Sequence, residues 1–232
     1  MRIYITDVTV PTIEFLSSGV SRERIERMEG FRFEIDKRRG LAAETLLNYG
    51  LKRLYGRLSF PVKLFRDEDG KPHLDLSDED KALLRSQGIL FSENIEFSLS
   101  HSGDYAVCAI SEGNEGEIGT DIEKHKRAQK GIAEHFFCEG EKQRIKTDED
   151  FYRYWTLKES FIKAVGKGLA ISLDSFEVFE KDGIASYKQS INDKVYTGRV
   201  YHPYPGYSLS VCAEGGNVRL PEQDEIETVR FF

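Results

Sequence analysis

The chain has 232 residues, of which 39% are hydrophobic and 31% charged, a composition typical of a globular protein with a substantial core. Its formal net charge of −7 argues against binding nucleic acid through overall electrostatic attraction. No uncharged stretch approaches the roughly twenty residues needed to cross a membrane, and the first residues lack the pattern of a secretion signal. We therefore expect a cytoplasmic protein with neither a membrane nor a nucleic acid as its partner.

The predicted elements begin with a strand at residues 2–10 and a charged helix at 21–38. A helix with a buried face follows, because apolar residues recur at helical spacing from Leu41 to Leu54, and it ends at Gly56. The first part of the chain is thus expected to run strand, helix and helix.

The middle of the chain predicts two strands around a polar turn at His101 to Asp104, in "IEFSLSHSGDYAVCAIS". A further strand begins at Ile118, helices are expected at 128–146 and at about 150–166, and strands close the chain. The second part of the sequence thus repeats much of the order of the first.

The tripeptide Val-Cys-Ala supports such a repeat. It occurs at 107–109 and at 211–213, each time in a predicted strand entered through a glycine-containing turn. We interpret the chain as two halves of like fold, residues 1–115 and 116–232. A pocket is then expected where the halves meet.

Carboxylates with a suggestive spacing occur in the second half. Asp121 and Glu123 are two residues apart in a predicted strand, so both side chains point to one side. Such hard oxygen ligands suit Mg²⁺, although a lone pair of this kind is more often an exposed strand end. In "WTLKESFIKAVGKG", Glu159 adds a third carboxylate if the helix crosses that strand, with Lys163 one turn further. The alternative is an ordinary surface ion pair between these two residues.

Several residues of the first half have the chemistry to bind phosphate. His101 can donate a hydrogen bond, and we prefer this role to a hydrolase pair with Ser100, because adjacent residues of an extended chain point apart. Arg39 and Lys71 are cations that could contact a phosphate, but each alone is more typical of a surface residue.

Taken in order, the segments "DKRRGLAAE", "DGKPHL", "FSLSHSG", "IGTDIE", "EHFFCEGEK" and "WTLKESFIKAVGKGL" resemble the motifs of the Sfp-type 4′-phosphopantetheinyl transferases. The last motif is similar to that of the subgroup with Lys-Glu-Ser. The resemblance covers most of residues 24–180. It implies an α+β fold in which two similar halves of one chain form a pseudo-dimer. Coenzyme A is expected to bind at the interface of the halves, and the protein is expected to be a monomer.

The resemblance also implies roles for single residues. Asp121, Glu123 and Glu159 correspond to the magnesium ligands of the family, and we expect them to share one ion. Glu159, Lys163 and His101 are the expected catalytic residues, with Glu159 accepting a proton directly or through a metal-bound water.

The residues implied for the coenzyme A site all have polar or basic side chains. They are Arg39, Lys71, Ser100, His101 and Lys163. Arg24 and Arg27 fall near further basic positions of the family.

The reaction implied is the Mg²⁺-dependent transfer of 4′-phosphopantetheine from coenzyme A to a serine of an acyl or peptidyl carrier protein, with release of adenosine 3′,5′-bisphosphate. The carrier is expected to dock near residues 124–137, where Lys124, Lys126, Arg127 and Lys130 are basic. The alternatives are a coenzyme A-binding protein of the same fold without turnover and an unrelated Mg²⁺-dependent phosphohydrolase.

Overall fold

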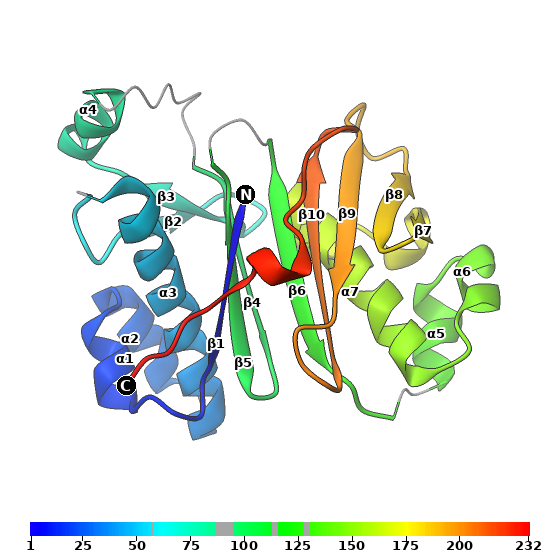
Figure 1. Cartoon of the computed structure of the whole chain (residues 1–232), viewed down its shortest axis with the longest axis horizontal. Helices are drawn as coiled ribbons and strands as arrows, with labels where there is room; N and C mark the ends of the chain where they lie inside the picture. Colours follow the sequence, from blue (N-terminus) through cyan, green and yellow to red (C-terminus); the bar gives the residue numbers. More distant parts are fainter. Residues whose placement is uncertain (57, 87–94, 113–115, 128–129) are drawn as a thin grey trace.

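The computed structural model describes the chain except for residues 57, 87–94, 113–115 and 128–129 (Figure 1). Its first half is a sheet with helices packed on one side. The elements of this half are β1 (Arg2–Asp7), α1 (Ile13–Ser18), α2 (Arg22–Glu29), α3 (Glu34–Tyr55), β2 (Lys63–Arg66), β3 (Pro72–Asp75), α4 (Asp78–Ser86), β4 (Phe97–Ser102) and β5 (Tyr105–Ile110).

The second half is also a sheet packed against helices. Its elements are β6 (Ile118–Lys124), α5 (Lys130–Phe136), α6 (Glu139–Arg144), α7 (Asp148–Val165), η1 (Gly168–Ala170), η2 (Leu173–Ser175), β7 (Glu177–Lys181), β8 (Ile184–Lys188), β9 (Tyr196–Tyr201), β10 (Tyr207–Glu214), η3 (Gln223–Glu225) and β11 (Glu227–Thr228). Its sheet has the strand order β6-β10-β9-β8-β7. The predicted α+β class is confirmed.

The two larger sheets meet edge to edge, with β4 beside β6, while β2 and β3 pair as a separate two-stranded sheet (Figure 1). The first sheet has the order β11-β1-β5-β4, so β4 is its edge strand. Three serine hydroxyls of β4 accept hydrogen bonds from backbone N–H groups of β6. These bonds join Ser98 to Thr120 at 2.9 Å, Ser100 to Ile122 at 3.3 Å and Ser102 to Lys124 at 3.1 Å. We call this row of side-chain contacts the serine ladder.

The repeated Val-Cys-Ala tripeptides occupy comparable places in the two sheets. One lies in β5, which pairs with β4, and the other in β10, which pairs with β6. Cys108 and Cys212 are both fully buried. Each tripeptide therefore lies in the strand that neighbours the edge strand at the junction.

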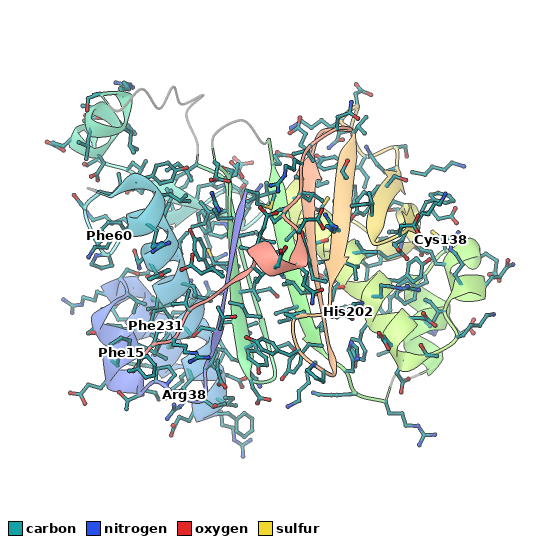
Figure 2. All side chains as sticks on the ribbon, viewed as in Figure 1. Phe15, Arg38, Phe60, Cys138, His202 and Phe231 are labelled. Carbon is teal, nitrogen blue, oxygen red and sulfur yellow. The ribbon has the colours of Figure 1, made fainter. Side chains whose placement is uncertain are left out.

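The end of the chain returns to the first half. β11 pairs in parallel with β1, and Val229 joins the core of that half. Phe231 packs against Phe15 of α1, with ring centroids 6.0 Å apart (Figure 2). The boundary expected at residues 115 and 116 stays a prediction, because 113–115 lie outside the described residues.

Two predicted helices are each divided in the structure. The charged helix expected at 21–38 ends at Gly30, and α3 begins after the extended residue Phe33. The helix expected at 128–146 becomes α5 and α6, because a new helix starts at Cys138, whose backbone N–H donates to the Glu141 carboxylate. Within the described parts of the chain, no helix is both long and apolar enough to span a membrane.

Candidate active site

Helix α7 lies directly on β6, and a glycine makes this contact possible. A Cβ atom at Gly119 would stand 1.9 Å from the carbonyl oxygen of Ser160 and 2.5 Å from the backbone nitrogen of Ala164. Any larger residue would therefore push the helix away from the strand. The close approach brings Glu159 and Lys163 over the part of β6 that bears Asp121.

Side chains from both halves line a cavity of about 540 Å³ at the junction. The lining includes seven of the eight predicted site residues: Lys71, Ser100, His101, Asp121, Glu123, Glu159 and Lys163. Arg39 is the predicted residue that does not line it, although its neighbour Gly40 does. The sequence patterns from distant parts of the chain thus meet at one cavity.

Asp121 is the most constrained carboxylate of the cavity. Its side chain is 6% exposed, and its Oδ1 accepts hydrogen bonds from Lys163 Nζ at 2.7 Å and from Ser100 Oγ at 2.8 Å. The buried Oδ2 atom has no hydrogen-bond partner among the described residues. A buried carboxylate oxygen without a partner is costly, so this atom marks a place where a cation or a donor would stabilise the fold.

Glu123 and Glu159 are half-buried beside Asp121. Burial raises the pKa of Glu123, and the neighbouring charge of Asp121 raises it further. The pKa of Glu159 is raised by the same two causes, whereas Lys163 opposes the shift. No described residue hydrogen-bonds the Glu159 carboxylate. Three carboxylates therefore lie close to one another at this end of the cavity, with Lys163 as the cation beside them.

The carboxylates of the cavity fit a magnesium ion that the protein coordinates only in part. In the described part of the chain, no three Asp, Glu, His or Cys side chains stand close enough together to hold a metal ion. Mg²⁺ commonly takes only one or two protein carboxylates and completes its octahedron with water and phosphate oxygens. Asp121, with its partner-free oxygen, and the two half-buried glutamates would supply those carboxylates. Shared ligation by all three residues stays a prediction.

His101 lies near the end of β4, at the edge of the cavity. Although solvent reaches this residue, the protein around the imidazole lowers its pKa, and the positive charges of Lys163 and Arg39 lower it further. The favoured neutral ring offers one N–H donor. Arg39 lies close by, where its Nε donates to the Gly103 carbonyl at 2.7 Å and its Nη1 to Asp36 at 2.7 Å.

Lys71 is held within the site rather than exposed at the surface. Its Nζ atom lies 3.2 Å from the carboxylate of Glu96 and donates to the Ala164 carbonyl at 3.2 Å. The side chain is 10% exposed. The turn after β2 is thereby attached to the end of α7, so the lysine connects the two halves across the cavity.

The structure adds Arg66 to the residues found by sequence reasoning. Arg66 lines the cavity together with Arg24 and Arg27. Although Arg66 is exposed to solvent, the protein around its guanidinium lowers its pKa, and the positive charges of Arg27 and Arg24 lower it further. The family resemblance points to Arg24 and Arg27, whereas no sequence pattern singles out Arg66. Arg24 Nε is paired with the buried Glu44 carboxylate at 2.7 Å. Arg27 and Arg66 therefore contribute most of the positive charge that suits this end of the cavity to an anion.

Carboxylates on one side of the cavity and basic side chains on the other have the chemistry to bind a phosphate-bearing substrate. Comparison with known proteins agrees. Residues 9–113 match the family model "4′-phosphopantetheinyl transferase, N-terminal", and residues 117–212 match that of the 4′-phosphopantetheinyl transferase superfamily.

Two relatives from Bacillus subtilis are similar over most of their length. The 4′-phosphopantetheinyl transferase ffp is 33% identical over 206 residues, which cover 85% of this chain and 84% of the relative. The 4′-phosphopantetheinyl transferase Sfp of strain 168 is 32% identical over 208 residues, 86% of this chain and 84% of the relative. The chain therefore belongs to the Sfp-type 4′-phosphopantetheinyl transferases and is a phosphopantetheinyl-transferring enzyme.

A smaller part of the chain is similar to a solved structure. The holo-(acyl-carrier-protein) synthase from Bacillus anthracis, determined in complex with CoA (3′,5′-ADP), is 22% identical with a TM-score of 0.38. The match covers 43% of this chain and 96% of that protein.

Proposed function

We propose that the enzyme transfers 4′-phosphopantetheine from coenzyme A to a serine of an apo acyl or peptidyl carrier protein, with Mg²⁺ at the carboxylates. The observation that carries this proposal is the meeting of Asp121, Glu123, Glu159 and Lys163 at one cavity, with a buried oxygen of Asp121 left without a partner. The arginines at the other end suit the phosphates of the nucleotide.

In the proposed reaction, the carrier serine oxygen bonds to the phosphorus that bears the pantetheine arm. The bond from that phosphorus to the bridging diphosphate oxygen breaks, and adenosine 3′,5′-bisphosphate leaves with the electron pair. Negative charge grows on the leaving phosphate, and we assign to Lys163 the role of offsetting it. A bound Mg²⁺ would supply charge neutralisation at the same diphosphate.

Glu159 is the proposed acceptor of the serine proton. Its raised pKa and its freedom from hydrogen bonds to the described residues fit a group that takes up a proton. We expect Glu159→Gln to lower the transfer rate by at least about 100-fold, because loss of a general base typically costs that much. The mass gain of an apo carrier protein, incubated with coenzyme A and Mg²⁺, measures the transfer.

The matched control is Glu180→Gln, which alters another half-buried carboxylate of the second half that does not line the cavity. Near-normal transfer by the Glu159 variant at saturating Mg²⁺ and coenzyme A would remove Glu159 from this role. If the wild-type enzyme released phosphate without modifying any carrier, the proposed transfer itself would be wrong.

The carrier protein is proposed to dock near residues 124–137. Lys126 and Arg127 are exposed there, as an acidic partner would require. Lys124 is less available, since its Nζ lies 2.7 Å from the Asp104 carboxylate. Residues 128–129 and the side chain of Lys130 lie outside the described residues.

Reversing the exposed charges tests this docking surface. We expect Lys126→Glu with Arg127→Glu to slow carrier association by about tenfold or more at low salt and to leave the KM for coenzyme A within about twofold. Stopped-flow binding of a labelled carrier gives the first value and steady-state kinetics the second. The proposed docking surface would be excluded if carrier association and coenzyme A affinity fell equally. It would also be excluded if reversing Lys181 and Lys188, on β7 and β8, slowed association as much.

A further inference from the structure

The serine ladder does more than join the two sheets, because two of its hydroxyls also contact carboxylates of the cavity. Ser100 Oγ donates to Asp121 Oδ1 at 2.8 Å, and Ser102 Oγ donates to Glu123 Oε2 at 2.6 Å. Ser98 contacts no carboxylate among the described residues. One row of serines thus contains members with and without a link to the acidic cluster.

We propose that Ser102 is a positioning residue that fixes the Glu123 carboxylate for the cation. The inference rests on the proposed function, since it assumes that the carboxylates hold Mg²⁺. Ser102 belongs to the first half and Glu123 to the second. A residue on the edge strand of one half thus fixes the position of a carboxylate of the other half.

The geometry of Ser102 defines the direction of its hydrogen. The hydroxyl oxygen accepts from the backbone N–H of Lys124 at 3.1 Å, which holds the oxygen against β6. Its single hydrogen is then directed to Glu123 Oε2. No described residue hydrogen-bonds the other oxygen, Oε1. Ser102 therefore occupies one carboxylate oxygen and leaves Oε1 available as a ligand.

Glu123 depends on this serine more than Asp121 depends on Ser100. Asp121 is nearly buried and is also held by Lys163 at 2.7 Å. Glu123 is only half-buried, and Ser102 is its sole hydrogen-bond partner among the described residues. A long side chain without that contact has several rotamers to adopt, which weakens ion binding.

The test compares three variants of the serine ladder by titrating Mg²⁺ into each protein saturated with coenzyme A, using calorimetry. We expect Ser102→Ala to weaken Mg²⁺ binding by about tenfold or more, as losing an outer hydrogen bond to a ligand commonly does. Ser98→Ala also removes one bond of the ladder but no carboxylate contact, and it should change the affinity by less than about twofold. Ser102→Thr keeps the hydroxyl and should restore most of the affinity.

Thermal unfolding without metal reports the structural cost of each change and should be similar for the two alanine variants. Equal Mg²⁺ affinities of Ser102→Ala and Ser98→Ala would overturn the role of Ser102, while leaving the proposed function intact. An Mg²⁺ affinity of Ser102→Thr as low as that of the alanine variant would also overturn it. If the wild-type protein bound no Mg²⁺ in this titration, the metal site of the proposed function would fail, and the inference with it.

Discussion

Asp121→Asn lowers the rate of phosphopantetheine transfer by at least about 100-fold, the loss expected when a group that organises charge stabilisation is removed. The amide keeps the shape of the side chain but removes its charge. Lys163 and Ser100 both donate to Asp121 Oδ1, so the substitution disturbs the positions of both and removes a hard ligand of the proposed cation. Steady-state transfer to a carrier protein, at saturating coenzyme A and Mg²⁺, measures the effect.

Asp80→Asn is the matched control for this experiment. Asp80 is another buried aspartate, 7% exposed, but it accepts hydrogen bonds from Ser59 and Ser77 and does not line the cavity. Its substitution should lower stability and leave the transfer rate of the folded protein close to normal. A fully active Asp121 variant, or equal loss of activity in both, would contradict the importance assigned to the cavity carboxylate.

The largest effect on stability is expected from Lys158, which stands beside Glu159 in the sequence but faces the core. The Lys158 side chain is fully buried, and its Nζ lies 2.8 Å from Glu141 and donates to the carbonyls of Leu173 and Phe176 at 2.7 Å. Lys158→Met leaves the buried Glu141 charge without its partner. We expect a loss of about 3–5 kcal/mol in the free energy of unfolding, measured with a chemical denaturant.

A second substitution separates the ion pair from packing. Glu141→Gln added to Lys158→Met removes the unpaired charge and should recover more than half of the lost stability. Lys142→Met is the control and lies on α6, the helix of Glu141. Its ammonium is 3.6 Å from the exposed Glu139 carboxylate, a contact that should contribute less than about 1 kcal/mol to stability. A Lys158 variant as stable as the Lys142 variant would show that the buried pair does not hold α6 against α7.

The sequence predicted the site where short-range spacing was sufficient. A period of two in a strand put Asp121 and Glu123 on one side, and a period of 3.6 in a helix put Glu159 and Lys163 on one face. Both patterns are local. That the helix crosses the strand at the right place depends on Gly119, which lies about forty residues away from Glu159 and carries no such signal on its own.

Contacts between distant residues could not be predicted in the same way. Lys158 reads as a surface lysine until Glu141, from another helix, is placed beside it. Arg66 lies exposed in a short strand whose sequence gives no indication of an anion site. In both cases the tertiary fold, rather than local propensity, decides the environment of a charged side chain.

The most direct test of the central claim is a crystal structure of the enzyme with coenzyme A and Mn²⁺ in place of Mg²⁺, using the anomalous signal to locate the ion. The account predicts one strong peak in the junction cavity, within about 2.3 Å of a carboxylate oxygen from Asp121, Glu123 or Glu159 and in contact with the diphosphate. A peak elsewhere, or coenzyme A bound in the cavity without an ion at these carboxylates, would contradict it.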